Sequence, residues 1–210
     1  MQHQLLFSIL GLLSLVAVLI SLRTFLSIMP SLVACILRAK ENINLEESAR
    51  LVRERNVVYL VLLVPAAIAI SWYNLWCIDV FDTWLPEFRF LITVGMIGAG
   101  VGMKVLLARL MEPRGVNRKL YNAVKFSFRN FSVTATLLCL VTIGTMSLFG
   151  ADDESIKSVT LCVAGGVYVI YLLRKLQIIA SFRDIFSSIL YLCALELLPT
   201  GIIVAAGVIF

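Results

Sequence analysis

Histidine, charge and paired cysteines are scarce in this 210-residue sequence. His3 is the one histidine, which excludes catalysis or metal binding that needs several imidazoles. The five cysteines show no paired spacing, so neither a disulfide framework nor a zinc site is indicated. The sequence has no phosphate-binding loop, no dinucleotide-binding fingerprint, no Gly-x-Ser-x-Gly and no Asp-rich metal motif. We therefore expect a protein that is not an enzyme and has no metal and no cofactor.

The balance of charged and apolar residues points away from a soluble protein. Charged residues make up 15% and hydrophobic residues 60% of the sequence, and the mean hydropathy is +0.97. Soluble domains carry about 25% charged and about 45–50% apolar residues. A soluble chain this apolar would expose large apolar patches to water and aggregate. The composition predicts a single integral membrane domain, residues 1–210.

Long apolar runs organise the chain. A helix needs about 20 mostly apolar residues to cross a bilayer, and backbone groups in hydrocarbon must be hydrogen-bonded internally. Strands of a membrane barrel would be shorter and would alternate in polarity. We therefore predict an all-α, polytopic transmembrane helical bundle with about six spanning helices and short interfacial helices. The expected spans are residues 5–22, 57–76, 90–110, 131–149, 159–176 and 185–210.

Residues 24–37 form a shorter uncharged segment that contains Pro30. Because this segment is short for a span, it is expected to be interfacial or re-entrant, or else to continue the first helix. The first run, 5–22, is preceded by no Lys or Arg and exceeds the length of a signal-peptide core. We therefore expect a retained first helix.

Basic residues are distributed unevenly between the spans. Nearly all of the 18 Lys and Arg residues follow the first, third or fifth span. Because basic residues accumulate on the cytoplasmic side of membrane proteins, the loops 38–56 and 111–130 are predicted to be cytoplasmic and both termini to lie outside. The net charge of +5 is then explained by membrane orientation. We expect no nucleic-acid partner.

Glu196 lies near the middle of the last apolar run. An ionised carboxylate at the bilayer centre costs on the order of 2.5–3.5 kcal/mol on insertion scales, and such residues usually face the bundle interior. One interpretation is a proton- or ion-responsive carboxyl or a ligand contact. The other is a protonated side chain that hydrogen-bonds a neighbouring helix. Lys104 is within reach, but we expect it to extend to the cytoplasmic face, and Pro199 predicts a kink beside Glu196.

Small residues recur in three of the predicted spans. Because small side chains let membrane helices approach closely, they predict packing faces. The third span is expected to be a central packing helix on this basis. The predicted packing glycines are Gly95, Gly98, Gly102, Gly165, Gly166 and Gly201.

The last span carries a distinctive motif. Tyr191, Cys193, Glu196 and Pro199 are spaced as Tyr-Leu-Cys-x-Leu-Glu-x-x-Pro, and these four residues form the candidate functional intramembrane site. The motif resembles the C-terminal helix of a family of uncharacterised bacterial integral membrane proteins, known as a domain of unknown function. The resemblance implies the inner membrane of a bacterium with two membranes, and it implies no activity.

Three functions are compatible with these observations. The first is a structural or accessory component of a bacterial envelope membrane assembly, whose partners are the lipid bilayer and other membrane proteins or a second copy of the chain. The alternative is a small proton- or ion-coupled transporter that uses Glu196, although we find no clear internal repeat. An enzyme that acts on lipid fits least, because paired intramembrane acids are missing.

Overall fold

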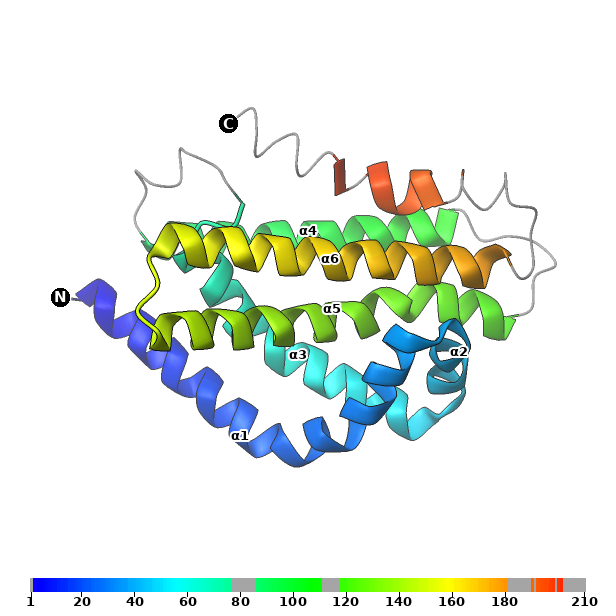
Figure 1. The fold of residues 1–210 in the computed structure, drawn as a ribbon, viewed down its shortest axis with the longest axis horizontal. Coiled ribbons are helices and arrows are strands. Elements are labelled where there is room, and N and C mark those ends of the chain that lie inside the picture. The colour runs from blue at the N-terminus through cyan, green and yellow to red at the C-terminus, as the bar shows by residue number, and fades with distance from the viewer. Residues whose placement is uncertain are drawn as a thin grey trace.

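The bundle consists of long helices that run side by side (Figure 1). The computed structural model describes residues 2–76, 86–110, 118–180, 190, 192–198 and 200–201. Within these residues every regular element is a helix, which confirms the predicted all-α class. The elements are α1 (Gln2–Leu37), α2 (Ala39–Glu47), α3 (Ala49–Trp72), α4 (Pro86–Leu110), α5 (Arg118–Leu148), α6 (Asp153–Ala180) and the π-helical turn η2 (Cys193–Leu197).

Five of the described helices, α1, α3, α4, α5 and α6, are long and apolar enough to cross a membrane. The mean hydropathy of their most apolar segments lies between 1.7 and 2.3. The chain is therefore a multi-pass membrane protein. The sixth expected span, 185–210, lies mostly outside the described residues, and η2 is its main described part.

Residues 24–37 continue α1 without a break, so the alternative that they extend the first helix is confirmed, and the expectation of a separate interfacial or re-entrant segment is corrected. Ile28, Leu32 and Cys35 are buried here, one or two turns apart on one face of the helix. Ile28 and Leu32 pack with Val58 of α3 and Val133 of α5. The segment is too short to be predicted as a span by itself, and its contacts with α3 and α5 bury its apolar side chains.

Two segments expected as basic loops are helical in the described residues. Residues 38–56 contain all of α2 and the first two turns of α3, and α5 begins at Arg118, inside the expected loop 111–130. The first turns of α5 are helical because they have a narrow buried face. Ala123, Val124 and Ser127 are buried on this face, although neighbouring residues are polar. Residues 111–117 lie outside the described part of the chain.

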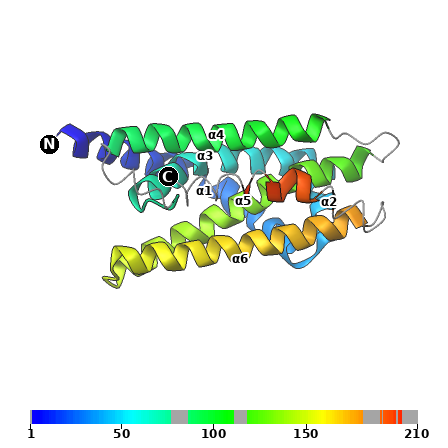
Figure 2. The same ribbon diagram turned by 90° about the horizontal axis from the view of Figure 1, so that it is seen from above.

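Helix α5 occupies the middle of the bundle. It packs along α6 on one side and against α3 and α2 on the other, while α1 lies on α3. Viewed from above, α4 and α6 flank the bundle on opposite sides (Figure 2). Helix α2, the start of α5 and the end of α6 share one end of the bundle, to the right in Figure 1. Basic clusters distant in the sequence therefore meet at one end, which we call the basic end.

The predicted packing glycines do not pack within the described bundle. All six are exposed, and a Cβ atom built on any of them would have no neighbour within 4 Å. Among the described elements α4 lies at the edge of the bundle and contacts mainly α3 and η2, so the expected role of α4 as a central packing helix stays a prediction. Larger residues such as Ile28 and Val133 fill the helix interfaces instead.

Candidate functional site

Glu196 is held between two lysines from two different helices. Its side chain comes from η2 and is 1% exposed. Lys104 of α4 donates from Nζ to Glu196 Oε2 at 2.7 Å. Lys175 of α6, also 1% exposed, donates from Nζ to Glu196 Oε1. We call Lys104, Lys175 and Glu196 the charge triad, and it ties three elements together.

Aromatic rings surround the two ammonium groups of the charge triad. Lys104 Nζ lies 3.8 Å from the centre of the Phe128 ring of α5. Lys175 Nζ donates to the hydroxyl of Tyr171, one turn earlier in α6, at 3.1 Å. Phe131 packs against Tyr171 with 5.4 Å between ring centres. The Phe128 ring face attracts the Lys104 ammonium, and the Tyr171 hydroxyl accepts from Lys175, so both contacts add to the ion pairs.

A second contact holds the backbone of η2. The Tyr168 hydroxyl donates to the Glu196 carbonyl oxygen at 3.3 Å, and it lies 3.0 Å from Thr200 Oγ1. The π-helical turn is closed by the Leu198 N–H, which donates to the Cys193 carbonyl. π-Helical turns often occur at functional sites, and this one contains Glu196.

Two of the four predicted site residues can be placed, and Glu196 is the one that the structure joins to other polar groups. Cys193 is exposed and has no disulfide. Tyr191 and Pro199 lie outside the described residues, so the predicted kink at Pro199 does too. The prediction that Lys104 extends to the membrane surface is wrong, because its ammonium turns inward to Glu196.

Lys175 was missed as a partner of Glu196. It stands at the end of an apolar run, where a lysine is ordinarily assigned to the membrane surface. The available signal was the rule that intramembrane charges pair with one another. Applied to Glu196, that rule selects basic residues inside or bordering other apolar runs, and Lys104 and Lys175 are both of this kind.

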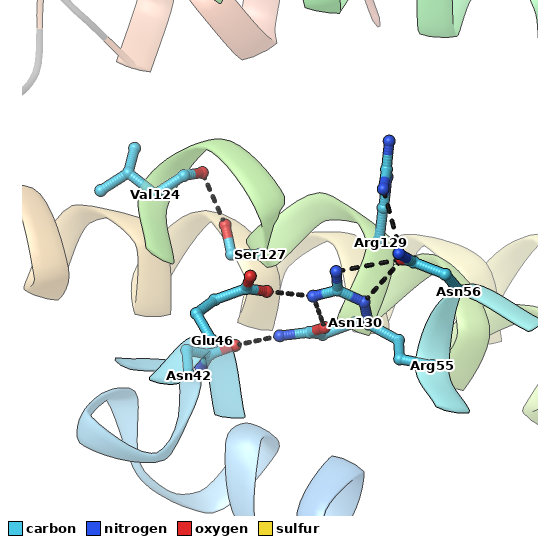
Figure 3. A network of polar contacts seen from close by, with 8 residues as sticks. All are labelled: Asn42, Glu46, Arg55, Asn56, Val124, Ser127, Arg129 and Asn130. Carbon is cyan, nitrogen blue, oxygen red and sulfur yellow. Dashed lines mark hydrogen bonds and ion pairs between the residues drawn. The ribbon is translucent and has the colours of Figure 1, made fainter. Parts of the chain in front are cut away.

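A second buried polar network lies at the basic end (Figure 3). Arg55 of α3 is 1% exposed and forms an ion pair with Glu46 of α2. Arg55 Nη1 also donates to Asn130 Oδ1 of α5 at 3.0 Å. Asn130 Nδ2 donates to Asn42 Oδ1 at 3.1 Å, and Asn42 Nδ2 donates to the Cys35 carbonyl at 3.1 Å. These contacts fasten α2 to α1, α3 and α5.

The protonation of Glu46 reflects this burial. Burial raises the pKa of Glu46 above its ordinary value of 4.5, and the neighbouring Arg55 guanidinium opposes part of that rise. The Glu46 carboxyl can accept a hydrogen bond from Arg55 in either protonation state. The network therefore holds the helices together, and Glu46 is its carboxyl group.

The chemistry available to the two sites is ionic and hydrogen-bonding. The described residues include no group of three His, Cys, Asp or Glu side chains that could hold a metal ion. The charge triad has one carboxylate, both of whose oxygens are occupied by ammonium groups. This arrangement suits the joining of helices.

Comparison with known proteins gives a family and no function. The family model described as "Domain of unknown function (DUF4271)" matches residues 5–206. No curated protein and no solved structure matches the chain. The expected membership of a family known as a domain of unknown function is thereby confirmed, while a bacterial source and the importance of the C-terminal motif stay predictions.

Proposed function

Since the chain belongs to the family described as "Domain of unknown function (DUF4271)", which names no activity, we propose its function from the structure. We propose that the protein is a non-enzymatic structural or accessory component of a bacterial envelope membrane assembly. In this proposal it resides in the inner membrane, with its basic end in the cytoplasm and both termini outside. Positive charge on the cytoplasmic side supports that orientation.

The closed charge triad is the observation that carries this proposal. Both carboxylate oxygens of Glu196 are paired, with lysines of α4 and α6, and the side chain is 1% exposed. A coupling carboxyl in a transporter must exchange its proton or ion with water on alternate sides of the membrane. A carboxylate held by the buried ammonium of Lys175 and the partly exposed ammonium of Lys104 is better suited to fixing helices. The triad therefore supports a structural role.

Helix α4 supports association with another membrane helix. Gly95, Gly98 and Gly102 are exposed on α4, and a Cβ built on them meets no neighbour within 4 Å in the part of the chain that the structure describes. Small residues at this spacing let a second helix approach closely and gain van der Waals contact. We propose that a helix of another assembly component packs on these glycines.

Co-purification from native membranes tests the proposed function. The tagged full chain is purified in a mild detergent, and bound proteins are quantified relative to it. A stoichiometric membrane protein is expected with the wild type and is expected to be lost with Gly98→Leu. Gly144→Leu is the matched control, because Gly144 is exposed on α5 and also has no neighbour within 4 Å. Equal recovery with both variants, or no stoichiometric partner, contradicts the proposal.

One observation favours the alternative of a small proton- or ion-coupled transporter. A cavity of about 50 Å³ borders the charge triad and is lined in part by Lys104, Lys175 and Glu196. A cavity at a buried carboxylate is a place where water or an ion could enter. Flux of protons or ions into liposomes that carry the purified protein, lost with Glu196→Gln, would favour this alternative.

A further inference from the structure

The cavity beside the charge triad contains an excess of positive charge. Its charged lining consists of Lys104, Lys125, Arg129, Lys175 and Glu196, which are four cations and one carboxylate. They come from α4, α5, α6 and η2. Cations in a partly dry cavity are costly unless an anion compensates them.

The described residues supply only part of that compensation, through Glu196 and through Glu46, whose charge acts on Arg129 without forming an ion pair with it. Glu196 is already paired with Lys104 and Lys175 through both of its oxygens. Arg129 donates to the neutral Asn56 Oδ1 at 3.2 Å, and Lys125 Nζ lies 5.6 Å from the centre of the Phe126 ring. No ion pair joins Lys125 or Arg129 to a carboxylate in the described part of the chain. Both side chains are half-buried, so an incoming anion can reach them.

An apolar groove begins where the basic cavity ends. It has a volume of about 250 Å³ and runs between α3, α4 and α5. Tyr59, Val101, Lys104 and Phe128 line both the cavity and the groove. From there the groove continues along α3 to Trp76, in the turn that follows the end of this helix. Its remaining lining is mostly aliphatic and includes Leu62, Leu63, Ile70, Ile97 and Val133.

We propose that this combined site binds one anionic phospholipid. The phosphate of the lipid lies in the basic cavity, where Lys125 and Arg129 donate to its oxygens. The ammonium group of Lys104 also donates, through an N–H that does not face Glu196. One acyl chain follows the groove along α3 and α4. Charge complementarity identifies the head group, and the continuous aliphatic lining distinguishes a lipid from free phosphate. The lipid site does not depend on any protein partner.

The head group is tested by a lipid titration. Fluorescent phosphatidylglycerol is titrated into the purified full chain in detergent, with phosphatidylcholine as the zwitterionic comparison. The double variant Lys125→Ala/Arg129→Ala is expected to weaken binding of phosphatidylglycerol by at least about tenfold, since each of the two basic residues attracts the anionic head group. The matched control is Lys40→Ala/Arg53→Ala, which removes the same charges from exposed positions near the basic end.

The acyl chain is tested by filling the groove from α4. Gly100 lines the groove, so Gly100→Leu is expected to weaken lipid binding by about tenfold while leaving the basic cavity unchanged. Gly98→Leu places the same side chain on the exposed face of the same helix and is expected to bind lipid as the wild type does. Melting curves of all variants show which of them are folded.

Three results would overturn the lipid site. The first is equal affinity of the wild type for phosphatidylglycerol and phosphatidylcholine. The second is equal binding by the cavity variant and its exposed-charge control. The third is displacement of the lipid by excess inorganic phosphate together with no effect of Gly100→Leu, which would assign the cavity to free phosphate alone.

Discussion

Lys104 and Glu196 are 92 positions apart in the sequence, and their side chains meet at 2.7 Å inside the bundle. This ion pair joins α4, at the edge of the bundle, to the C-terminal turn η2. Because Lys175 of α6 holds the other oxygen of Glu196, one carboxylate links three elements. The first prediction follows from this link.

Removing the carboxylate should destabilise the fold. Glu196→Gln leaves two ammonium groups without a compensating charge, and loss of one partner from a buried ion pair typically costs about 3–5 kcal/mol. We expect a clear drop in the melting temperature in detergent. Glu154→Gln, at an exposed position near the start of α6, is the control and should melt as the wild type does.

Replacing the buried pair as a whole gives the complementary result. Glu196→Leu combined with Lys175→Met should recover most of the stability lost by Glu196→Leu alone, because apolar residues of similar size often replace a buried ion pair without loss. Lys104 is partly exposed and can turn toward water. Equal losses in the single and double variants would mean that Lys175 does not act on Glu196.

The second prediction concerns pH. Burial raises the pKa of Glu46 above 4.5 in the folded state. Between the ordinary and the raised pKa the folded chain binds more protons than the unfolded chain, so stability falls as the pH rises through this window and then levels off. Glu46→Gln should remove this part of the pH dependence of the melting temperature. Glu41→Gln, on the same helix, should retain it.

The third prediction concerns Arg174, which joins α6 to the end of α1. Its Nε donates to the Ile36 carbonyl and its Nη2 to the Leu37 carbonyl, each at 2.8 Å. Two carbonyls at a helix end need outside partners, and lysine lacks the fork that serves both. Arg174→Lys should therefore speed hydrogen exchange at residues 36–40 at the α1–α2 corner. Unchanged exchange there would show that water replaces the guanidinium.

The fourth prediction separates open from packed small residues. Gly98→Ala should change the stability of the isolated protein by less than about 1 kcal/mol, because its Cβ meets nothing within 4 Å. Ala67→Leu should cost about 1–3 kcal/mol, because Ala67 is fully buried in α3 and a larger side chain overpacks the interface. Similar melting temperatures for the two variants would contradict the exposed position of α4.

The fold was predictable where long-range contacts were not needed. Apolar runs of about 20 residues mark spanning helices whatever their neighbours, and α3, α4, α5 and α6 contain most of the expected spans. The start of α5 was read as a loop because its polar residues outnumber a buried face made of small side chains, such as Ala123 and Ser127. Nothing in the local pattern reveals that α2 and α6 cover that face.

The site was predictable in part for the same reason. Glu196 is conspicuous because an acid in an apolar run is costly, and it does lie at the centre of a buried cluster. Its partners lie 92 and 21 positions away, so pairing depended on the arrangement of helices. The sequence assigned Arg55 and Asn130 to polar loops. Their burial depends on α2 folding back over α3 and α5, which the local sequence pattern does not show.

Proton flux in reconstituted liposomes tests the central claim most directly. Vesicles that carry the wild type, Glu196→Gln or no protein are given a pH gradient, and the internal pH is followed with an enclosed dye. If the charge triad is a structural tie, the wild-type vesicles should lose the gradient no faster than empty ones. Faster, saturable loss with the wild type that disappears with folded Glu196→Gln protein would contradict a structural role and assign Glu196 to transport.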